Sequence, residues 1–344
     1  MAADLVIILL LLCCSPSSAN LFVSLDCGAT STYQDAYGIT WNPDNAYIQS
    51  GDTAHTADGA TGAIQTLRHF KSRKKNCYSI PGEPGGKVLV RASFNYGNYD
   101  LNSSPPTIDL HFDGNYWTTV MTSLDEYNVY EVTYVPTGNN ISVCVAQIYT
   151  NQFPFMSALE VRSLENNMYN QFNSSYALFL NQRSAFGVDP LSLPPPLRYG
   201  QYGYDQYDRI WDESGSTNWI SVTSNASSVD VSQTADNPPQ SVFEYAITTS
   251  DVSVDLSLPN ILPSSSVPVY INMYFSEVSE LDYTVDSRNF NLYIDDSTQP
   301  PLINAMEVFV VSDPLTAGTY ANDVISITTA SPGPFLISLA PFLI

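Results

Sequence analysis

The sequence predicts an all-β fold, and three observations support this. Apolar and polar residues alternate with period two in each patterned stretch, and the clearest face is shared by Val88, Val90, Ala92, Phe94 and Tyr96. No stretch of eleven or more residues keeps the i, i+3, i+4, i+7 spacing of an amphipathic helix. The 23 Pro and 17 Gly residues interrupt the chain at the spacing typical of a β-sandwich.

Three further strands are expected in the first half. Apolar residues at 108, 110 and 112 alternate with polar ones and run into the turn pair Asp113-Gly114. Tyr130, Val132 and Tyr134 form the next strand, and the stretch 141–145 forms another. Gly82–Lys87 is one residue short of a phosphate-binding loop and lacks its hydroxyl residue, so it is interpreted as a turn that enters the strand from Val88.

The second half repeats this pattern. Val269, Ile271, Met273 and Phe275 alternate as the residues from Val88 to Phe94 do, at an offset of 181 residues. Residues 290–295 echo 108–113, and Ile325 and Ile327 echo Val143 and Val145, at offsets of 181 to 182. A constant offset predicts two like domains. We expect a first domain over 20–192, a stiff Pro-rich connector over 193–198, and a second domain over 199–344.

Length and charge limit the possible ligands. A chain of 344 residues with 44% hydrophobic residues is long and apolar enough for two folded cores. It carries 12 Lys and Arg against 34 Asp and Glu, for a net charge of −22. Such a chain repels phosphate backbones and anionic lipid headgroups, which argues against nucleic acid and a basic membrane contact. Sugars, peptides and cations remain as ligand classes.

The charge is unevenly distributed. Up to Pro196 there are 9 bases and 16 acids, and beyond it there are 3 bases and 18 acids, so the second domain is the more acidic. Seven of the 12 bases lie between Arg68 and Arg91. A solvated loop is the simpler interpretation of this positive strip, and a contact for an anion or an acidic peptide is the alternative.

The N-terminus has the form of a secretory signal peptide. Leu5–Cys14 is an apolar run of ten residues, too short to span a bilayer, and it is followed by small residues. We expect residues 1–19 to be cleaved after Ala19, although a buried first strand is the alternative. The sequons at Asn102, Asn140, Asn173 and Asn225 agree with a secreted or cell-surface location. No later apolar run approaches the length of a membrane span.

Three cysteines remain after signal cleavage. Cys13 and Cys14 leave with the signal, so Cys27, Cys77 and Cys144 permit one disulfide and leave one thiol. All three pairings stay open.

Catalytic and metal-binding signatures are scarce. The three histidines are scattered, and neither a Cys-x-x-Cys nor a His-Glu-x-x-His motif occurs. Carboxylate pairs such as Asp109 and Asp113 could in principle hydrolyse glycosides, but nothing selects a pair facing across a cleft. We therefore expect no enzyme, no metal site and no cofactor.

Aromatic residues are more informative, because 23 Tyr residues supply rings with a polar handle. Tyr96-Gly97-Asn98-Tyr99-Asp100, at the end of the best strand, combines two rings, an amide and a carboxylate, which suits a sugar. Its candidate ligand contacts are Tyr96, Asn98, Tyr99 and Asp100, with Arg91 on the adjoining strand as a donor. A strand end packed on its own loop is the alternative. A second Tyr cluster ending at Tyr207 is expected to pack the two domains together.

An ordered series of motifs carries a family resemblance. It comprises Phe22–Gly28, Thr66–Phe70, Asn76–Tyr78, Tyr96–Asp100, Trp117–Val120, Val143–Val145, Ser157–Val161 and Asp208–Trp211. This series resembles the malectin-like ectodomain of plant leucine-rich-repeat receptor-like kinases. The resemblance implies two tandem malectin-like β-sandwich domains of the jelly-roll, galactose-binding-like type, which bind ligands and do not catalyse. In malectin, aromatic and acidic loop residues hold a glucose disaccharide, and its aromatic pair corresponds to Tyr96–Tyr99.

Two departures from the family pattern matter. Leucine repeats, a membrane span and a kinase are missing, so the chain cannot signal alone. In the second module the segment Phe275–Glu280 lacks a counterpart of the aromatic pair Tyr96 and Tyr99. We also expect the strand that corresponds to Ser157–Val161 to be absent, which predicts an exposed sheet edge and a frayed, sticky end at Phe335–Ile344.

We therefore predict an extracellular recognition module that binds cell-wall carbohydrate or a peptide. The alternative is a structural interaction module or receptor decoy whose acidic face docks a basic peptide or co-receptor.

Overall fold

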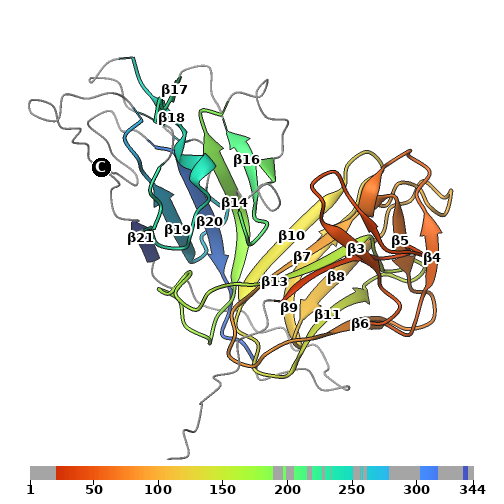
Figure 1. The fold of residues 1–344 in the computed structure, drawn as a ribbon. Coiled ribbons are helices and arrows are strands. Elements are labelled where there is room, and N and C mark those ends of the chain that lie inside the picture. The colour runs from red at the N-terminus through yellow and green to blue at the C-terminus, as the bar shows by residue number, and fades with distance from the viewer. Residues whose placement is uncertain are drawn as a thin grey trace, which may run out of the picture.

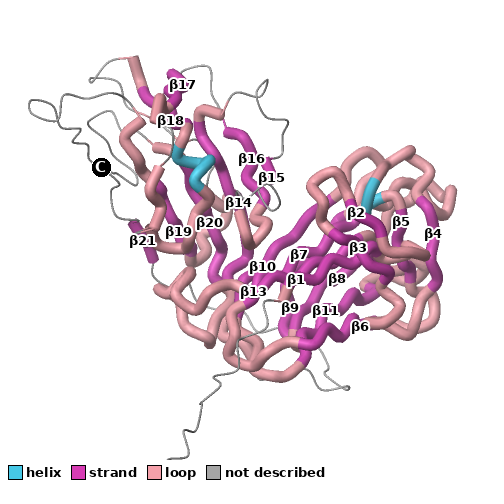
Figure 2. The backbone as a smooth tube through the Cα atoms, viewed as in Figure 1, coloured by secondary structure: helices cyan, strands magenta, loops and turns pink. Residues whose placement is uncertain are grey.

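The computed structural model describes residues 21–188, 197–198, 205–214, 219–226, 229–232, 234–250, 256, 258, 262–278, 303–316 and 336–339, with only the backbone at 197–198 and 336–339. The predicted strands at 290–295 and 325–327 and the end at 340–344 lie outside this part of the chain. Its described elements are strands apart from two short 3₁₀ helices, η1 (Gly62–Ile64) and η2 (Gln240–Phe243) (Figure 2). The all-β prediction is confirmed.

The strands fall into two lobes (Figure 1). The first lobe contains β1 (Phe22–Asp26), β2 (Tyr33–Gln34), β3 (Thr40–Pro43), β4 (Asp52–His55), β5 (Thr66–His69), β6 (Lys75–Pro81), β7 (Val88–Phe94), β8 (Thr107–Phe112), β9 (Asn115–Met121), β10 (Asn128–Tyr134), β11 (Asn140–Gln147), β12 (Phe155–Met156) and β13 (Ala158–Ser163). The second lobe contains β14 (Leu178–Phe186), β15 (Leu197–Arg198), β16 (Ile210–Ser214), β17 (Ile220–Thr223), β18 (Tyr245–Thr248), β19 (Val269–Tyr274), β20 (Ala305–Val311) and β21 (Leu336–Leu339).

The first lobe is a sandwich. Its main sheet has the order β2-β3-β1-β13-β7-β10, and it faces a four-stranded sheet of order β6-β11-β8-β9. The alternating apolar residues of both sheets meet in one core, in which Val90, Phe94, Leu110 and Val143 are fully buried. The predicted turn is present, since Asp113 and Gly114 both take the positive φ angles that a tight hairpin needs.

The second lobe repeats the strand order of the first. Its strands β15-β16-β14-β20-β19 correspond in sheet position to β2-β3-β1-β13-β7. The parallel pair of β1 and β3 reappears as β14 and β16, and the antiparallel pair of β4 and β5 reappears as β17 and β18. The two described halves therefore share the order and pairing of these strands, although β21 pairs parallel with β19 where β10 pairs antiparallel with β7. Strand β19 confirms the strand predicted at the offset of β7.

The expected missing strand has a counterpart, and this corrects the sequence prediction. Ala305-Met306-Glu307-Val308 in β20 pairs with β19 in the register in which Ala158-Leu159-Glu160-Val161 in β13 pairs with β7. Glu160 lies opposite Arg91, and Glu307 lies opposite Asn272. The prediction failed because it placed the counterpart near residue 341, whereas the connection between the paired strands is shorter in the second lobe.

The division between the lobes also differs from the predicted boundary. Leu178–Phe186 was expected in the first domain, but it forms β14, the counterpart of β1, and pairs with β20 and β16 over most of its length. Only two residues at its start, Leu178 and Phe179, pair with β10. This short contact joins the main sheets of both lobes into one continuous sheet, from which the lobes diverge in Figure 1. The separation into lobes therefore begins before Leu178.

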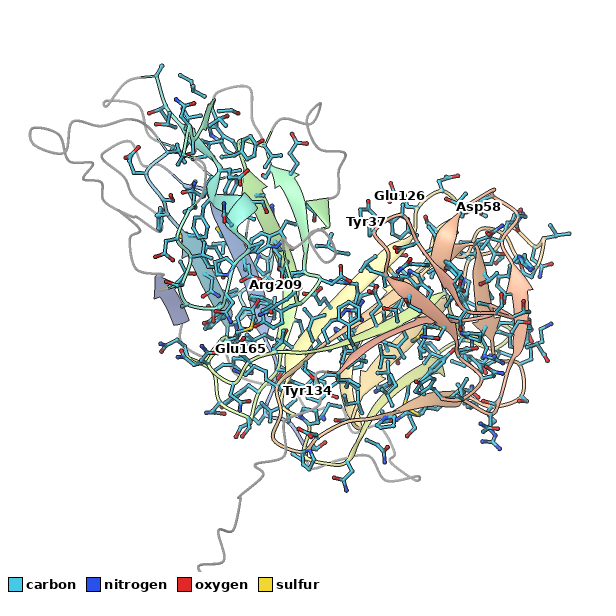
Figure 3. All side chains as sticks on the ribbon, in the orientation of Figure 1. Tyr37, Asp58, Glu126, Tyr134, Glu165 and Arg209 are labelled. Atoms are coloured by element: carbon cyan, nitrogen blue, oxygen red, sulfur yellow. A yellow bond between two sulfur atoms is a disulfide. The ribbon has the colours of Figure 1, made fainter. Side chains whose placement is uncertain are left out.

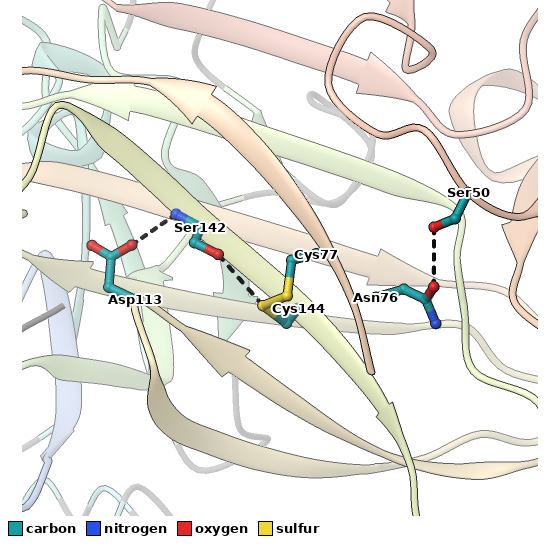
Figure 4. The surroundings of a disulfide bond; sticks show 6 residues. All are labelled: Ser50, Asn76, Cys77, Asp113, Ser142 and Cys144. Atoms are coloured by element: carbon teal, nitrogen blue, oxygen red, sulfur yellow. Dashed lines mark hydrogen bonds between the residues drawn. A yellow bond between two sulfur atoms is a disulfide. The ribbon is translucent and has the colours of Figure 1, made fainter. Parts of the chain in front are cut away.

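A disulfide links two strands of the first lobe. Of the three open pairings, the structure forms Cys77–Cys144, which joins β6 to β11 at directly opposed positions (Figure 4). Ser142, beside it on β11, donates its backbone N–H to Asp113, 2.7 Å away. Cys27 is the remaining thiol and is buried in the core.

Candidate functional site

The predicted ligand loop follows β7 at the end of the first lobe. Gly97 and Asn98 both adopt positive φ angles, 44° and 51°, a conformation that glycine and asparagine tolerate best. The Asn98 side-chain oxygen accepts a hydrogen bond from the Ser103 backbone N–H at 2.8 Å. The sequence thus folds this segment into a compact loop that is held by its own side chains.

The two tyrosines of the loop are packed rather than displayed. Tyr96 is fully buried, and its hydroxyl donates to Asp100 Oδ1 at 2.5 Å. Tyr99 is half-buried, with its ring stacked on His69 at a centroid distance of 5.2 Å and tilted against Phe155 at 5.9 Å. One face of Tyr99 is therefore already covered by the protein.

Asp100 is an anion whose two oxygens are both engaged. Burial acts to raise its pKa, but the hydrogen bonds from Tyr96 and Asn102 lower it below the ordinary value. Oδ1 accepts from the Tyr96 hydroxyl, and Oδ2 accepts from Asn102 Nδ2 at 3.0 Å. Burial together with this carboxylate raises the pKa of Tyr96 to about 12, so its hydroxyl remains a donor. This geometry fits the alternative interpretation of the segment, in which the strand end packs on its own loop.

His69 is the one unsatisfied group beneath the loop. Its ring is buried under Tyr99, and its Nδ1 has no hydrogen-bond partner. Burial, with the nearby charge of Lys71, lowers its pKa, so the imidazole is neutral near pH 7. A buried polar atom without a partner is the only feature of this loop that favours an added ligand.

Arg91 does not reach this loop as a free donor, which differs from the sequence expectation. It is 1% exposed, and its guanidinium contacts Glu131 at 3.0 Å and Glu160 at 3.2 Å. The alternation predicted a half-buried strand with Arg91 on its polar face. However, β7 is buried on both faces, because the junction between the lobes covers that polar face. Because the guanidinium is buried, it contacts these carboxylates and does not face a ligand in solvent.

Arg91 belongs to a buried set of charges that we call the junction network, made of Arg91, Glu131, Glu160, Arg162, Arg183, Asp208, Arg209 and Glu307. Glu131 on β10 is its link between the lobes. One of its oxygens contacts Arg91 of the first lobe, and the other lies 2.5 Å from Arg183 on β14 of the second lobe. Arg183 in turn contacts Glu307 on β20 at 2.7 Å.

A second branch of the junction network runs from Glu160 on β13. Its Oε2 lies 2.6 Å from Arg162, and Arg162 contacts Asp208 at 2.9 Å. Asp208 also offers its backbone carbonyl to Arg91. Because every such charge is removed from water, each one requires its partners, and the loss of one partner leaves another charge buried alone.

The electrostatics of Glu131 and Glu307 agree with this arrangement. Burial acts to raise both pKa values, but Arg183 with Arg91 lowers that of Glu131, and Arg183 with Arg209 lowers that of Glu307. Both groups are therefore ionised. Arg209, labelled in Figure 3, lies within the second lobe, where it contacts Asp205 at 2.7 Å.

Apolar packing completes the junction. Leu89 from β7 joins Tyr169, Tyr207, Tyr270 and Phe309 in one cluster that contains residues of both lobes. Tyr207 is thus in the place expected of it, whereas Tyr199, Tyr202 and Tyr204 lie outside the described residues.

Sequence reasoning missed most of the junction network. A signal existed in the repeated strands Ala158-Leu159-Glu160-Val161 and Ala305-Met306-Glu307-Val308, each of which carries one carboxylate inside an apolar run. An acidic residue at the same place in both copies indicates a buried partner of opposite charge. The identity of that partner depends on strand order, which the pattern does not give.

The described residues hold no group of three or more His, Cys, Asp or Glu side chains placed to bind a metal. In the same part of the chain, no helix has the length and hydropathy needed to cross a membrane.

Comparison with known proteins gives one matching family model, described as the malectin-like domain, over residues 25–297. An uncharacterized Arabidopsis thaliana protein, At1g24485, is 33% identical over 343 residues, which cover 87% of this chain and 66% of the relative. A probable leucine-rich-repeat receptor-like serine/threonine kinase, MEE39 of the same plant, is 30% identical over 80% of this chain and 31% of its own length. This chain thus spans two thirds or less of these relatives.

Solved structures support the fold. The extracellular domain of ANXUR1 from Arabidopsis thaliana has a TM-score of 0.61 at 14% identity and covers 85% of this chain and 97% of its own. FER in complex with the plant peptide RALF23 and LLG2 has a TM-score of 0.55 at 15% identity and covers 85% of this chain and 95% of its own. At such low identity the likeness shows the fold alone.

Proposed function

This chain belongs to the malectin-like domain family, and from that premise we propose that it is an extracellular recognition module, without catalytic activity, that binds a cationic peptide. The similarity to receptor-like kinases and to an extracellular domain supports a ligand outside the cell. A co-receptor with a basic face would carry the same positive charge and could bind in the same way.

The observation that carries this proposal is where the positive charges lie. Five of the 12 basic residues, namely Lys87 and the arginines at 91, 162, 183 and 209, are buried in or near the junction. Among the described residues, the exposed bases are confined to Lys71, Arg73 and Lys74. A chain of net charge −22 therefore presents a mostly acidic surface, which attracts cationic ligands and speeds their association.

The fold neighbours support a peptide ligand by analogy. One of them is FER in a complex with the peptide RALF23 and LLG2, which pairs a fold of this kind with a peptide and a further protein. The aromatic loop of this chain, by contrast, uses its own side chains to satisfy Tyr96, Asn98 and Asp100. The balance of these observations favours a peptide over a sugar.

Salt dependence tests the proposal. Secreted protein is titrated with a panel of cationic plant peptides, with oligolysine of equal charge as the control for non-specific attraction. We expect one peptide to bind at least about tenfold more tightly than oligolysine, and its affinity to fall by about tenfold between low and physiological ionic strength. The proposal is contradicted if no peptide binds more tightly than oligolysine, or if the affinity of the peptide does not change with ionic strength.

Carbohydrate binding at the loop is the second candidate, and the unpartnered Nδ1 of His69 beneath Tyr99 favours it. If a sugar ring stacks on the open side of Tyr99, Tyr99→Ala weakens oligosaccharide binding by about 1 to 3 kcal/mol. Tyr116→Ala is the matched control, because Tyr116 is exposed at the opposite end of the same lobe. Equal affinities for the two variants on a glycan array would remove the loop as a sugar site.

A further inference from the structure

Exposed apolar side chains gather at one end of the first lobe, which we call the loop end. Eleven large hydrophobic residues are exposed in the part of the chain that the structure describes, and seven of them lie there: Leu101, Met121, Leu124, Tyr127, Val129, Ile148 and Tyr149. The antiparallel pairing explains the gathering, because β7, β9 and β11 end where β8 and β10 begin. Glu126, labelled in Figure 3, marks this end, far from the contact of β10 with β14.

Hydrogen bonds hold the connecting segments of the loop end together. Thr122 donates its hydroxyl to the Pro106 carbonyl at 2.7 Å, and the Thr107 backbone N–H donates to Gln152 at 2.8 Å. The segment that contains Leu101 is thereby tied to the segments that contain Met121 and Tyr149. Exposed apolar side chains that gather at one end of a secreted protein normally have something covering them.

One of the four sequons lies on this surface. Asn102 is exposed beside Leu101, which is 76% exposed. The side-chain nitrogen of Asn102 is oriented by Asp100, which accepts from it at 3.0 Å, and Asp100 also accepts from the Asn102 backbone N–H at 3.2 Å. The acceptor nitrogen of the sequon is therefore fixed at the rim of the aromatic loop.

We propose that an N-linked glycan on Asn102 covers the apolar loop end and occupies the aromatic loop, so that the sugar held there is the chain's own. In the transfer, Asn102 Nδ2 forms a bond to the anomeric carbon of an oligosaccharide, and the bond from that carbon to the diphosphate of its lipid carrier breaks. Nδ2 gives up one proton as the diphosphate leaves. The proton that stays on Nδ2 keeps the hydrogen bond to Asp100.

Two physical consequences follow. The apolar C–H faces of the first sugar residues lie against Leu101 and its neighbours, which removes that surface from water. A separate ligand that approaches Asp100 meets the glycan, because Asp100 Oδ2 accepts a hydrogen bond from the nitrogen that carries it. The inference depends on secretion of the chain and is independent of the proposed peptide ligand.

The test uses the full chain secreted from plant cells. Glycopeptide mass spectrometry measures occupancy at Asn102, which we expect to be nearly complete. Ser104→Ala removes the sequon and keeps the Ser104 backbone N–H, which donates to Tyr96. This variant should bind a hydrophobic dye about threefold more strongly and be cut by chymotrypsin after Tyr99 or Leu101 about fivefold faster.

Asn140→Gln is the matched control, because it removes an exposed sequon at the start of β11, on the opposite end of the same lobe. Its dye binding and cleavage should match those of the unaltered protein. An unglycosylated Asn102 in the secreted protein overturns the proposal. So does a Ser104→Ala variant that resembles Asn140→Gln in both measurements while unfolding at the same temperature.

Discussion

The two lobes share one scaffold and differ in what they attach to it. Both place an Ala-x-Glu-Val strand beside a partner strand in the same register, and in both a side chain accepts a backbone hydrogen bond from a residue just beyond that partner strand. Asn95 N–H donates to Ser157 in the first lobe, and Ser276 N–H donates to Asn304 in the second. The two lobes therefore share these backbone positions and this hydrogen bond at the strand end.

The differences lie at the strand ends and at the junction. The first lobe continues past Asn95 into an aromatic loop, whereas the second continues into Glu277 and the buried Val278. Arg91 in the first lobe is replaced by Asn272 in the second, although both lie opposite the conserved position of the repeat, Glu160 or Glu307. The two lobes thus share a frame of strands, and the junction has unlike partners on its two sides.

Breaking the junction network should have the largest effect, because it removes the connection between the lobes. Arg183→Met leaves Glu131 and Glu307 buried without their shared partner. We expect the free energy of unfolding to fall by about 3 to 5 kcal/mol and the two lobes to unfold separately, measured by chemical denaturation with two probes. Arg73→Ala, at an exposed position, is the control and should change stability by less than about 0.5 kcal/mol.

The disulfide distinguishes the lobes, because all three cysteines outside the expected signal peptide lie in the first lobe. Replacing Cys77 and Cys144 together by Ala should lower the unfolding free energy of that lobe by about 2 to 4 kcal/mol, since the bridge closes a loop across 67 residues. Calorimetry should show the first lobe melting earlier while the second lobe keeps its transition. If the transitions of both lobes shifted equally, the junction would couple the lobes so strongly that they unfold together.

A pair of glycines tests whether the lobes use the same backbone device. Gly28 after β1 and Gly187 after β14 both have positive φ angles, and a Cβ on either would collide with a backbone oxygen, of Leu67 or Ala246. Each Gly→Ala change should cost about 2 to 3 kcal/mol from φ strain and the collision together. Gly59→Ala, which has a positive φ but open space around it, should cost about 1 kcal/mol. If only one of the two changes, Gly28→Ala or Gly187→Ala, lowers the free energy of unfolding by this amount, the two glycines are not equivalent.

The last effect is spread over a pH range and lies in the second lobe. Burial raises the pKa of Asp236 to about 6, although hydrogen bonds from Tyr169 and Asn272 act against this. Since the folded state holds this proton more tightly than the unfolded state, stability falls as pH rises from about 4 to 6, by up to about 1.4 kcal/mol per pH unit.

Asp236→Asn should flatten that decline, measured by denaturation at a series of pH values. The lowered pKa values of Glu131 and Glu307 act in the opposite sense, because their stabilisation is present above the ordinary pKa of glutamate and is lost as pH falls. If the unfolding free energy of the variant changes with pH between 4 and 6 as steeply as that of the unaltered chain, groups other than Asp236 cause the decline.

Local patterns predicted the first lobe well. Alternation gave β7, β8, β10 and β11, and the Asp113-Gly114 pair gave the hairpin, because the period of two and the φ angles of a turn are local properties of the chain. The repeat at a constant offset likewise gave β19. The counterpart of β13 was missed, because a strand is matched by its sheet partner and not by its distance along the chain.

The alternation of residues could not predict the role of Arg91 for a similar reason. Alternation showed that Arg91 shares a face with other polar residues, and solvent was the simplest environment for that face. The second lobe supplies Asp208 and part of the cover over that face, and these groups lie far away in the sequence. The segment Tyr96–Asp100 follows β7 as a loop, but the hydrogen bonds of its side chains with Ser103 and Asn102 depend on the folded turn.

By itself, the sequence determined an all-β chain of two related halves, its acidity, its turns and the place of its aromatic loop, since these follow from local periodicity and composition. Only the tertiary structure decided which cysteines pair, that β10 and β14 join the main sheets, and that four arginines are buried among carboxylates. Those outcomes depend on contacts between residues distant in the chain, and a charge becomes a partner or a surface group only when the fold decides whether water can reach it.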